Sequence, residues 1–354
     1  MISEVLLPAV ARLIAEAGLR GDFSLYPLPG GTNNRVFRVE VNGCCVLLKA
    51  YFQHADDPRD RLGAEYAFTS FAWENGLRFL PQPIACDHEN QLGLYEFVMG
   101  RQLLPHEITE GVVREALNFY TELNRYRQLP GARALPKASE ACFTITEHLE
   151  CVQRRLENLM NMDTSSEINR EAMHFICNDL SKAWSKVTDS VRKRTFDLDL
   201  AMDVEITQKD RCLSPSDFGF HNAILAPDGH LRFIDFEYAG WDDPAKMVCD
   251  FFCQPAVPVL GQFFDLFIDD VVFQQCNPQS LRQRILLLMP VYRIKWCCII
   301  LNDFLPVGSE RRNYAANTFD QEVRRRMQLD KAYAYLTKNR SEINNVNCSR
   351  SKET

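Results

Sequence analysis

Hydrophobic and polar positions alternate along two stretches near the start of the chain, Phe23–Leu28 and Arg35–Val41. A period of two residues is typical of strands that bury one face. The dipeptide Asn42-Gly43 follows the second stretch and favours a two-residue hairpin turn. Cys44–Ala50 is therefore predicted to return as the partner strand.

A helix is predicted between this hairpin and the next one. Asp57 is expected to cap its start, because a carboxylate there can accept hydrogen bonds from the first free backbone amides. Asn75 and Gly76 predict its end. Pro83–Asp87 and Gly93–Val98 are then predicted to form a second hairpin.

The pattern changes after Gly100 to the three-to-four residue spacing of amphipathic helices. Three helical segments are predicted from Glu107 to about Ser190, and a longer helical region from Ala245 to Thr337. Between them, residues 213–237 are predicted to form strands and loops. The fold class that follows is α+β, with a small antiparallel sheet and one main helix preceding a larger, mostly helical part.

These patterns predict two lobes and a tail. Residues 1–98 are expected to form a lobe with an N-terminal helix, a five-stranded sheet and one further helix. Residues 99–338 are expected to form a helical lobe that carries the loop at 213–237. Residues 339–354 are polar and are expected to be a frayed tail.

Composition and charge narrow the class of protein. The chain has 354 residues, of which 46% are hydrophobic and 25% charged, with a net charge of −7 and no basic block. This disfavours a nucleic-acid binder or a protein of anionic membranes. Glu4 stands where a secretory signal would carry positive charge, and the 13 cysteines include no C-x-x-C pair. A reduced, cytoplasmic protein with buried thiols, no zinc site and no membrane segment is expected.

Three oxygen-bearing side chains bracket a predicted hairpin. Asp217 and Asn222 lie in the loop before it, and Asp235 closes its second strand. A hairpin brings its ends together, and a hard cation such as Mg²⁺ takes a few such ligands plus phosphate oxygens. The carboxylate of Asp217 would then be free to accept a hydrogen bond from an incoming hydroxyl group. Taken singly, Asp217 or Asn222 is better explained as a residue that caps a turn.

A lysine and a glutamate in the first lobe add a second signal. Lys49 ends an apolar strand, and Glu65 lies in the helix that follows. A strand lysine ion-paired to a helix glutamate is the arrangement that grips phosphates in kinase-type phosphoryl transfer. If the signal from Asp217, Asn222 and Asp235 were absent, an ordinary surface lysine and a solvated helix glutamate would be the better explanation.

Together these motifs resemble the aminoglycoside phosphotransferase and choline/ethanolamine kinase family over residues 25–255. The segment LPGGTNNRVFRV resembles its phosphate loop, GLYEFVMG its hinge and DFEYAG its metal-binding motif. The resemblance implies a protein-kinase-like two-lobe fold and the cofactors ATP and Mg²⁺. It implies catalysis by Asp217 and metal binding by Asn222 and Asp235. It also implies nucleotide binding by Gly31, Thr32, Asn33, Asn34, Lys49, Glu65, Glu96 and Val98.

The sequence departs from the family pattern before the catalytic aspartate. Pro215 and Ser216 replace the usual His-Gly, which predicts altered loop packing rather than lost chemistry. The phosphate loop is not G-x-G-x-x-G, and no Ala-Pro-Glu segment follows Asp235, so a peptide substrate is disfavoured.

The predicted function is transfer of the γ-phosphate of ATP to a hydroxyl of a sugar, aminocyclitol or similar metabolite, by a monomer or homodimer. Alternatives are a choline/ethanolamine-type amino-alcohol kinase, a catalytically weak nucleotide-binding module, and nucleotidyl transfer. Candidate acceptor-site residues are Glu237, Asp242, Tyr292, Arg293 and Trp296. Helix capping is the competing explanation for Asp242, core packing for Trp296, and His221 is expected to be a packing residue.

Overall fold

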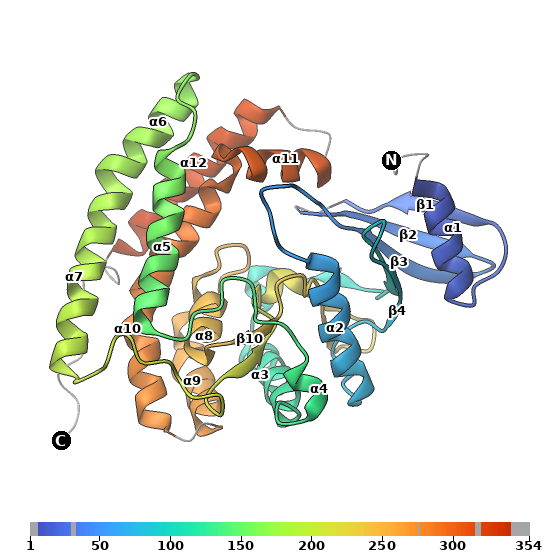
Figure 1. Ribbon diagram of the computed structural model, residues 1–354, viewed down its shortest axis with the longest axis horizontal. Coiled ribbons are helices and arrows are strands. Elements are labelled where there is room, and N and C mark those ends of the chain that lie inside the picture. The colour runs from blue at the N-terminus through green and yellow to red at the C-terminus, as the bar shows by residue number, and fades with distance from the viewer. Residues whose placement is uncertain (1–5, 30–32, 275–276, 316–319, 341–354) are drawn as a thin grey trace. The chain divides into compact units, whose positions relative to one another are not determined.

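The computed structural model describes residues 6–29, 33–274, 277–315 and 320–340 (Figure 1). The described residues form two compact units, and each is treated by itself. The first takes its residues from Met1–Ser139, Leu213–Trp241 and Glu310–Thr318. The second takes them from Glu140–Cys212, Asp242–Ser309 and Phe319–Thr354. The predicted sheet and the 213–237 loop therefore belong to one unit.

A five-stranded antiparallel sheet opens the first unit, with strand order β1-β2-β3-β5-β4 (Figure 1). Its strands are β1 (Phe23–Pro27), β2 (Arg35–Val41), β3 (Cys44–Ala50), β4 (Pro83–Asp87) and β5 (Leu92–Glu96). The predicted strands are confirmed to within two residues at each end. The predicted turn between β2 and β3 is confirmed. Asn42 and Gly43 adopt φ values of 47° and 80°, and Asn and Gly tolerate this left-handed conformation better than other residues.

Helix α1 (Leu7–Glu16) packs on this sheet with the apolar face that its sequence predicts. Val10, Leu13 and Ile14 are buried against Phe37, Leu48 and other inward-facing strand residues. The helix and the sheet thus form a two-layer core that holds β3 rigidly.

Helix α2 (Arg61–Glu74) begins later than predicted. Its N-cap is Asp60, whose carboxylate accepts a hydrogen bond from the amide of Gly63 over 2.8 Å. The predicted cap, Asp57, instead pairs with the side chains of Arg59 and Arg61. The predicted end is confirmed, since Asn75 is the C-cap.

The rest of the first unit is built around α3 (Glu110–Arg125) and a small three-stranded sheet. That sheet contains β6 (Arg101–Gln102), β8 (Ala223–Leu225) and β9 (Leu231–Phe233). The short helix α4 (Pro130–Arg133) follows α3 in the sequence. Phe119 of α3 stacks on Phe233 of β9, with ring centroids 4.9 Å apart. This aromatic contact fixes the hairpin whose ends carry the candidate chemistry.

The second unit is helical, in agreement with the helical pattern predicted for most of the chain after Gly100. It contains α5 (Ile145–Met160), α6 (Glu167–Phe175), α7 (Ser181–Asp197), α8 (Pro244–Cys253), α9 (Phe264–Phe273), α10 (Pro278–Ile300) and α12 (Gln321–Lys338). The strands β7 (Cys212–Ser214) and β10 (Gly240–Asp242) and the helix α11 (Pro306–Ala315) contain residues of both units. Helix α10 is central and packs against α5, α7, α8, α9 and α12.

One helical segment among the described residues, Pro278–Phe304, is long and apolar enough to cross a membrane. In the structure, 67% of its most apolar window is buried inside the protein. The core position of α10 accounts for this apolar sequence.

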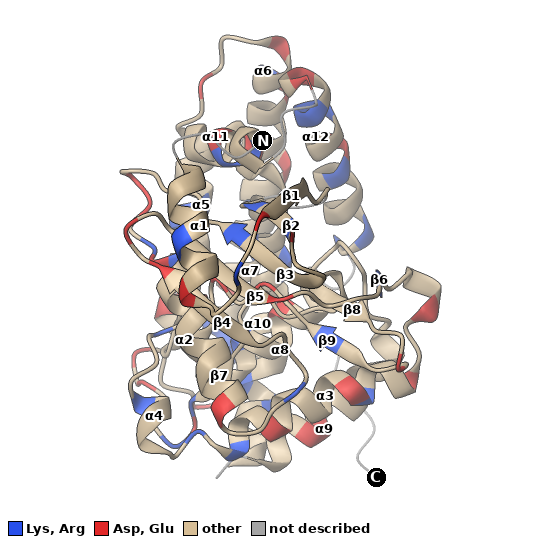
Figure 2. Ribbon diagram, turned by 90° about the vertical axis from the view of Figure 1, so that its right-hand side faces the viewer, with Lys and Arg blue, Asp and Glu red and all other residues tan. Residues whose placement is uncertain are grey.

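Basic residues gather along α12, where three consecutive arginines occur (Figure 2). Arg324 pairs with Asp303 over 2.7 Å, and Arg326 pairs with Glu171 over 2.7 Å. Arg325 donates to the side-chain oxygen of Asn169. All three arginines therefore bond to groups within the second unit.

Candidate active site

Lys49 lies on the central strand β3, opposite Val36 of β2 and Gly93 of β5. Its side chain is only 7% exposed. The ammonium group donates to Glu65 Oε2 over 2.6 Å and also forms an ion pair with Asp235. The structure thus brings together the strand lysine, the helix glutamate and the aspartate after β9.

Two tyrosines that the sequence reasoning missed support this ion pair. The Tyr51 hydroxyl donates to Glu65 Oε2 over 2.7 Å and lies 2.8 Å from the Tyr95 hydroxyl. Burial raises the pKa of Tyr51 well above its ordinary value, with the Glu65 carboxylate adding to the shift, so the hydroxyl stays protonated. Tyr51 follows Lys49 by two residues, and this spacing on an extended segment was the available signal.

Neighbouring carboxylates keep the Lys49 side chain protonated. Burial alone lowers the pKa of Lys49, but the carboxylates of Asp235, Glu65 and Glu237 outweigh it, so the pKa lies well above the ordinary value. A permanently charged, rigidly held ammonium group suits the binding of phosphate oxygens.

Asp217 lies in the loop before β8, with its side chain 27% exposed. His221 Nε2 is 3.2 Å from Asp217 Oδ1, so His221 contacts the predicted catalytic carboxylate, whereas the sequence indicated only packing. The Asn222 side chain donates from Nδ2 to the backbone carbonyl of Asp217 over 2.9 Å. Its amide oxygen is therefore the atom that Asn222 can offer to a cation.

Asp235 follows β9 and is brought beside the loop by the hairpin, as its sequence position predicts. The amide of Ile234 donates to the carbonyl of Asn222 over 2.9 Å. Asp235 adopts φ 68°, a left-handed conformation that aspartate tolerates better than most residues. Burial raises the pKa of Asp235; Lys49 opposes this shift, and the carboxylates of Glu237 and Glu65 reinforce it.

These residues fit a magnesium ion. Asn222 and Asp235 supply hard oxygen ligands of the kind that Mg²⁺ prefers. Among the described residues, no group of three or more His, Cys, Asp or Glu side chains could hold a metal ion. A two-ligand site is what Mg²⁺ uses when phosphate oxygens complete its shell.

The predicted phosphate loop is described only in part. Gly31 and Thr32 lie outside the described residues. Asn33 and Asn34 both donate side-chain hydrogen bonds to Glu237. The side-chain oxygen of Asn34 accepts from the amide of Phe52 over 3.1 Å.

The predicted hinge, Gly93–Gly100, begins within β5 and continues past its end. The amide of Glu96 donates to the carbonyl of Gln82 over 2.8 Å, and Val98 lies in the irregular segment that leads to β6. Gly100 in this segment has φ 149°, and a Cβ there would lie 2.4 Å from the carbonyl oxygen of Leu225. The connection therefore requires glycine and passes directly against β8.

The other acceptor-site candidates belong to the second unit and bond to groups within it. Asp242 is buried and pairs with Lys246, and Tyr292 is buried with its hydroxyl 2.8 Å from His148 Nδ1. Arg293 donates to the carbonyl of Phe252 over 3.1 Å, and Trp296 Nε1 donates to Asp250 Oδ1 over 2.8 Å. Asp242 and Tyr292 are buried, and their polar atoms contact protein groups, which argues against an acceptor-site role for both. Trp296, for which core packing was the competing explanation, is only partly buried.

The N-cap of α8 is Asp243 and not its neighbour Asp242, because the Asp243 carboxylate accepts from the amide of Ala245 over 2.7 Å. Its other oxygen accepts from Arg284 Nε over 2.5 Å and lies 3.1 Å from His148 Nε2. The Asp243 cluster, defined as Asp243, Arg284, His148 and Tyr292, is buried inside the second unit.

His148 is expected to make stability depend on pH. Burial lowers the pKa of His148 to about 4; Asp243 opposes this shift, and Arg284 and Lys246 reinforce it. The unfolded chain binds a proton at His148 below about pH 6.5, whereas the folded chain does not. The free energy of unfolding should therefore fall as pH decreases from about 6.5 to 4, by up to about 1.4 kcal/mol per pH unit.

Urea unfolding at pH 7.5 and 5.5 measures this effect. Wild type should lose about 1 kcal/mol more than His148→Gln across that range. An equal loss in both proteins would contradict the assignment.

Ser216 adopts φ 66°, a left-handed conformation, at the position where the family motif has glycine. The left-handed conformation costs a non-glycine residue about 1–2 kcal/mol, which exceeds the entropic cost of glycine of about 0.5–1 kcal/mol. Ser216→Gly is therefore expected to stabilise the protein by about 0.5–1 kcal/mol in thermal unfolding.

The matched control is Ser214→Gly in β7, because the Ser214 hydroxyl accepts from the amide of Ser216 over 3.0 Å. This substitution should lower the melting temperature. A lower melting temperature for Ser216→Gly would show that strain at this position is not relieved by glycine.

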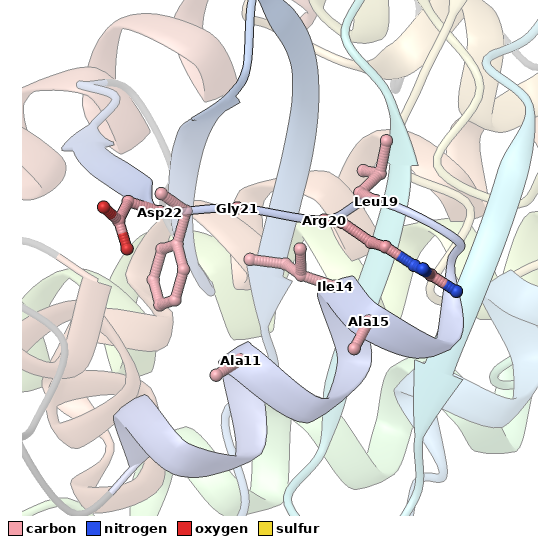
Figure 3. Close-up of a pocket in the computed structure, with 8 residues that line it drawn as sticks. Ala11, Ile14, Ala15, Leu19, Arg20, Gly21 and Asp22 are labelled. Atoms are coloured by element: carbon pink, nitrogen blue, oxygen red, sulfur yellow. The ribbon is translucent and has the colours of Figure 1, made fainter.

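A surface hollow of about 660 Å³ lies between the end of α1 and the start of β1 (Figure 3). Ile14, Leu19, Arg20 and Asp22 are among its lining residues. None of the predicted site residues lines it, so it is separate from the candidate active site.

A family model described as the phosphotransferase enzyme family matches residues 24–259 of the chain. No curated protein matches the chain in sequence. The matched range contains Lys49, Glu65, Asp217, Asn222 and Asp235.

Solved structures similar to this fold include two choline kinases. The enzyme from Cryptosporidium parvum is 13% identical, with a TM-score of 0.55 over 96% of each chain. The choline kinase LicA from Streptococcus pneumoniae is 15% identical, with a TM-score of 0.58 over 94% of this chain and 99% of that one.

A spectinomycin phosphotransferase in complex with ADP and spectinomycin is 12% identical, with a TM-score of 0.55 over 93% of this chain and 98% of that one. Together with the choline kinases, it confirms the predicted kinase-like fold.

Proposed function

Because the chain belongs to this phosphotransferase enzyme family, we propose that it transfers the γ-phosphoryl group of ATP to a hydroxyl group of a small molecule. The observation that carries this proposal is the meeting of Lys49, Glu65 and Asp235 in one unit, beside the loop of Asp217 and Asn222. Phosphoryl transfer needs these groups for positioning and charge neutralisation.

Nucleotide binding is assigned to the sheet and the connection after it. Lys49 would bind the α and β phosphates, with Glu65 and Tyr51 holding its ammonium group in place. The backbone N–H groups of residues 31–34 would cover the β and γ phosphates, and the backbone near Glu96 and Val98 would bind adenine. Asn222 and Asp235 would hold Mg²⁺, which supplies positive charge to the transferring group when bound.

Asp217 would act on the acceptor. Its carboxylate is partly exposed, and it would accept a hydrogen bond from the acceptor hydroxyl and take the proton as the new O–P bond forms and ADP leaves. His221, at 3.2 Å, would hold the Asp217 carboxylate in one orientation.

For the acceptor we infer a sugar, aminocyclitol or similar metabolite, with an amino alcohol of the choline type as the alternative. The similar solved structures support both classes, since they include choline kinases and a spectinomycin phosphotransferase. Arg293 and Trp296 are only partly buried and are the better acceptor candidates in the second unit. The two-lobe division at residue 98, the cytoplasmic location and a monomeric or homodimeric state remain predictions.

An acceptor screen with ATP and Mg²⁺, read by product mass, tests the reaction. Addition of one phosphate to an alcohol supports the proposal. Addition of AMP would assign nucleotidyl transfer instead. Nucleotide binding without turnover across sugars, aminocyclitols and amino alcohols would favour a catalytically weak nucleotide-binding module.

A further inference from the structure

Glu237 receives one hydrogen bond on each carboxylate oxygen from two consecutive asparagines. Asn33 Nδ2 donates to Oε1 over 2.7 Å, and Asn34 Nδ2 donates to Oε2 over 2.6 Å. Glu237 is only 2% exposed. Both oxygens of this buried carboxylate therefore accept hydrogen bonds from residues within the predicted phosphate loop, Leu28–Val39.

Arg61 of α2 completes this arrangement. Its Nε lies 3.6 Å from Glu237 Oε2, and its Nη1 donates to the carbonyl of Phe52 over 2.9 Å. The amide of Phe52 in turn donates to the side-chain oxygen of Asn34 over 3.1 Å. Three hydrogen bonds and one ion pair thus form a closed ring through Asn34, Glu237, Arg61 and Phe52. The ring joins the phosphate loop, the segment after β3, helix α2 and the segment after β9.

We propose that Glu237 is a positioning residue that fixes the phosphate loop relative to Asp235. Glu237 follows Asp235 by two residues, so its bonds to Asn33 and Asn34 tie the loop directly to the metal-binding segment. The role rests on the proposed function, because it concerns how the loop meets a nucleotide. It differs from an acceptor or metal-ligand role, in which a carboxylate oxygen would face the ligand.

The expected effect is on phosphate binding and not on adenine binding. Hydrogen bonds to an ionised carboxylate are roughly twice as strong as neutral ones, so replacing this carboxylate by an amide weakens both bonds. ATP affinity should then fall by about tenfold, which corresponds to about 1.4 kcal/mol. Adenosine, which has no phosphate for the loop to bind, should be affected less than about twofold.

Calorimetric titration of Glu237→Gln with ATP and with adenosine, each in Mg²⁺ and in EDTA, tests the proposal. The loss of ATP affinity should occur under both conditions. Tyr238→Phe is the matched control, because it leaves both bonds to Glu237 in place. It removes the contacts of the Tyr238 hydroxyl with Asn33 Nδ2 over 3.3 Å and with Arg311 Nη1 over 3.5 Å. Its ATP affinity should change less than that of Glu237→Gln.

Three results would overturn the positioning role. The first is an ATP affinity of Glu237→Gln equal to that of wild type. The second is a loss of ATP affinity that occurs in Mg²⁺ but not in EDTA, which would make Glu237 a metal ligand. If ATP and adenosine binding fall together, the double variant Asn34→Asp/Glu237→Gln decides the matter. It exchanges carboxylate and amide across the same contact and should recover most of the ATP affinity, whereas no recovery would refute the contact.

Hydrogen exchange without nucleotide separates this role from the proposed function. In Glu237→Gln, the amide of Phe52 should exchange at least about tenfold faster, because its acceptor Asn34 is released. Amides of α3 should be unchanged. Wild type that binds no nucleotide would refute the proposed function, and unchanged exchange at Phe52 would refute the tie between Glu237 and the loop.

Discussion

Asp217→Asn is expected to lower kcat by about 10²–10⁴-fold, the usual contribution of a positioned base. An amide has nearly the shape of the carboxylate but cannot take the proton of the acceptor hydroxyl. The bond from Asn222 goes to the backbone carbonyl of Asp217, so the predicted metal ligand stays in place in the variant. ATP affinity should therefore remain within about threefold of wild type.

The matched control is Asp228→Asn, which makes the same chemical change on the exposed turn between β8 and β9. Asp228 pairs there with Arg232 over 2.7 Å. Its turnover should equal wild type in a steady-state assay with the acceptor found by screening. Retention of more than a tenth of wild-type kcat by Asp217→Asn would remove Asp217 from the role of base.

Asp243→Asn is expected to destabilise the second unit by about 3–5 kcal/mol, because it removes one partner of a buried ion pair. The substitution leaves the Arg284 guanidinium buried with a neutral partner. Arg284 and His148 outweigh burial and hold the pKa of Asp243 at about 2, so the carboxylate is charged at neutral pH. Urea unfolding monitored by circular dichroism measures the loss.

Asp265→Asn provides the comparison, because Asp265 pairs with Arg282 over 2.6 Å but its side chain is 77% exposed. An exposed pair contributes about 0–1 kcal/mol, so this variant should unfold close to wild type. Equal unfolding midpoints for the two variants would show that burial of the Asp243 cluster does not determine its contribution.

Local signals explain which parts of the fold could be predicted. The β2–β3 hairpin depends on a turn dipeptide, and the end of α2 depends on Asn75 and Gly76, so both could be read from neighbouring residues. The start of α2 could not, because Asp57 is a good cap by type but is taken by Arg59 and Arg61.

Several contacts in the structure join residues that are far apart in the sequence, and most of these contacts could not be predicted. The Lys49–Glu65 pair spans 16 residues and was indicated by the family resemblance. The bonds from Asn33 and Asn34 to Glu237 span 204 and 203 residues, and no sequence pattern marks them. Likewise, the residues on α10 alone do not show that Tyr292 faces His148, 144 residues earlier.

Nucleotide-dependent thermal stabilisation of wild type and Asp235→Ala tests the central claim most directly. ATP with Mg²⁺ at about 100 times its dissociation constant should stabilise wild type by about 2.7 kcal/mol. The stabilisation should be lost in Asp235→Ala, because this variant lacks the carboxylate that would hold the metal ion beside Lys49. If ATP and GTP leave the melting temperature of folded wild type unchanged, the chain does not bind a nucleotide in this site and the account is wrong.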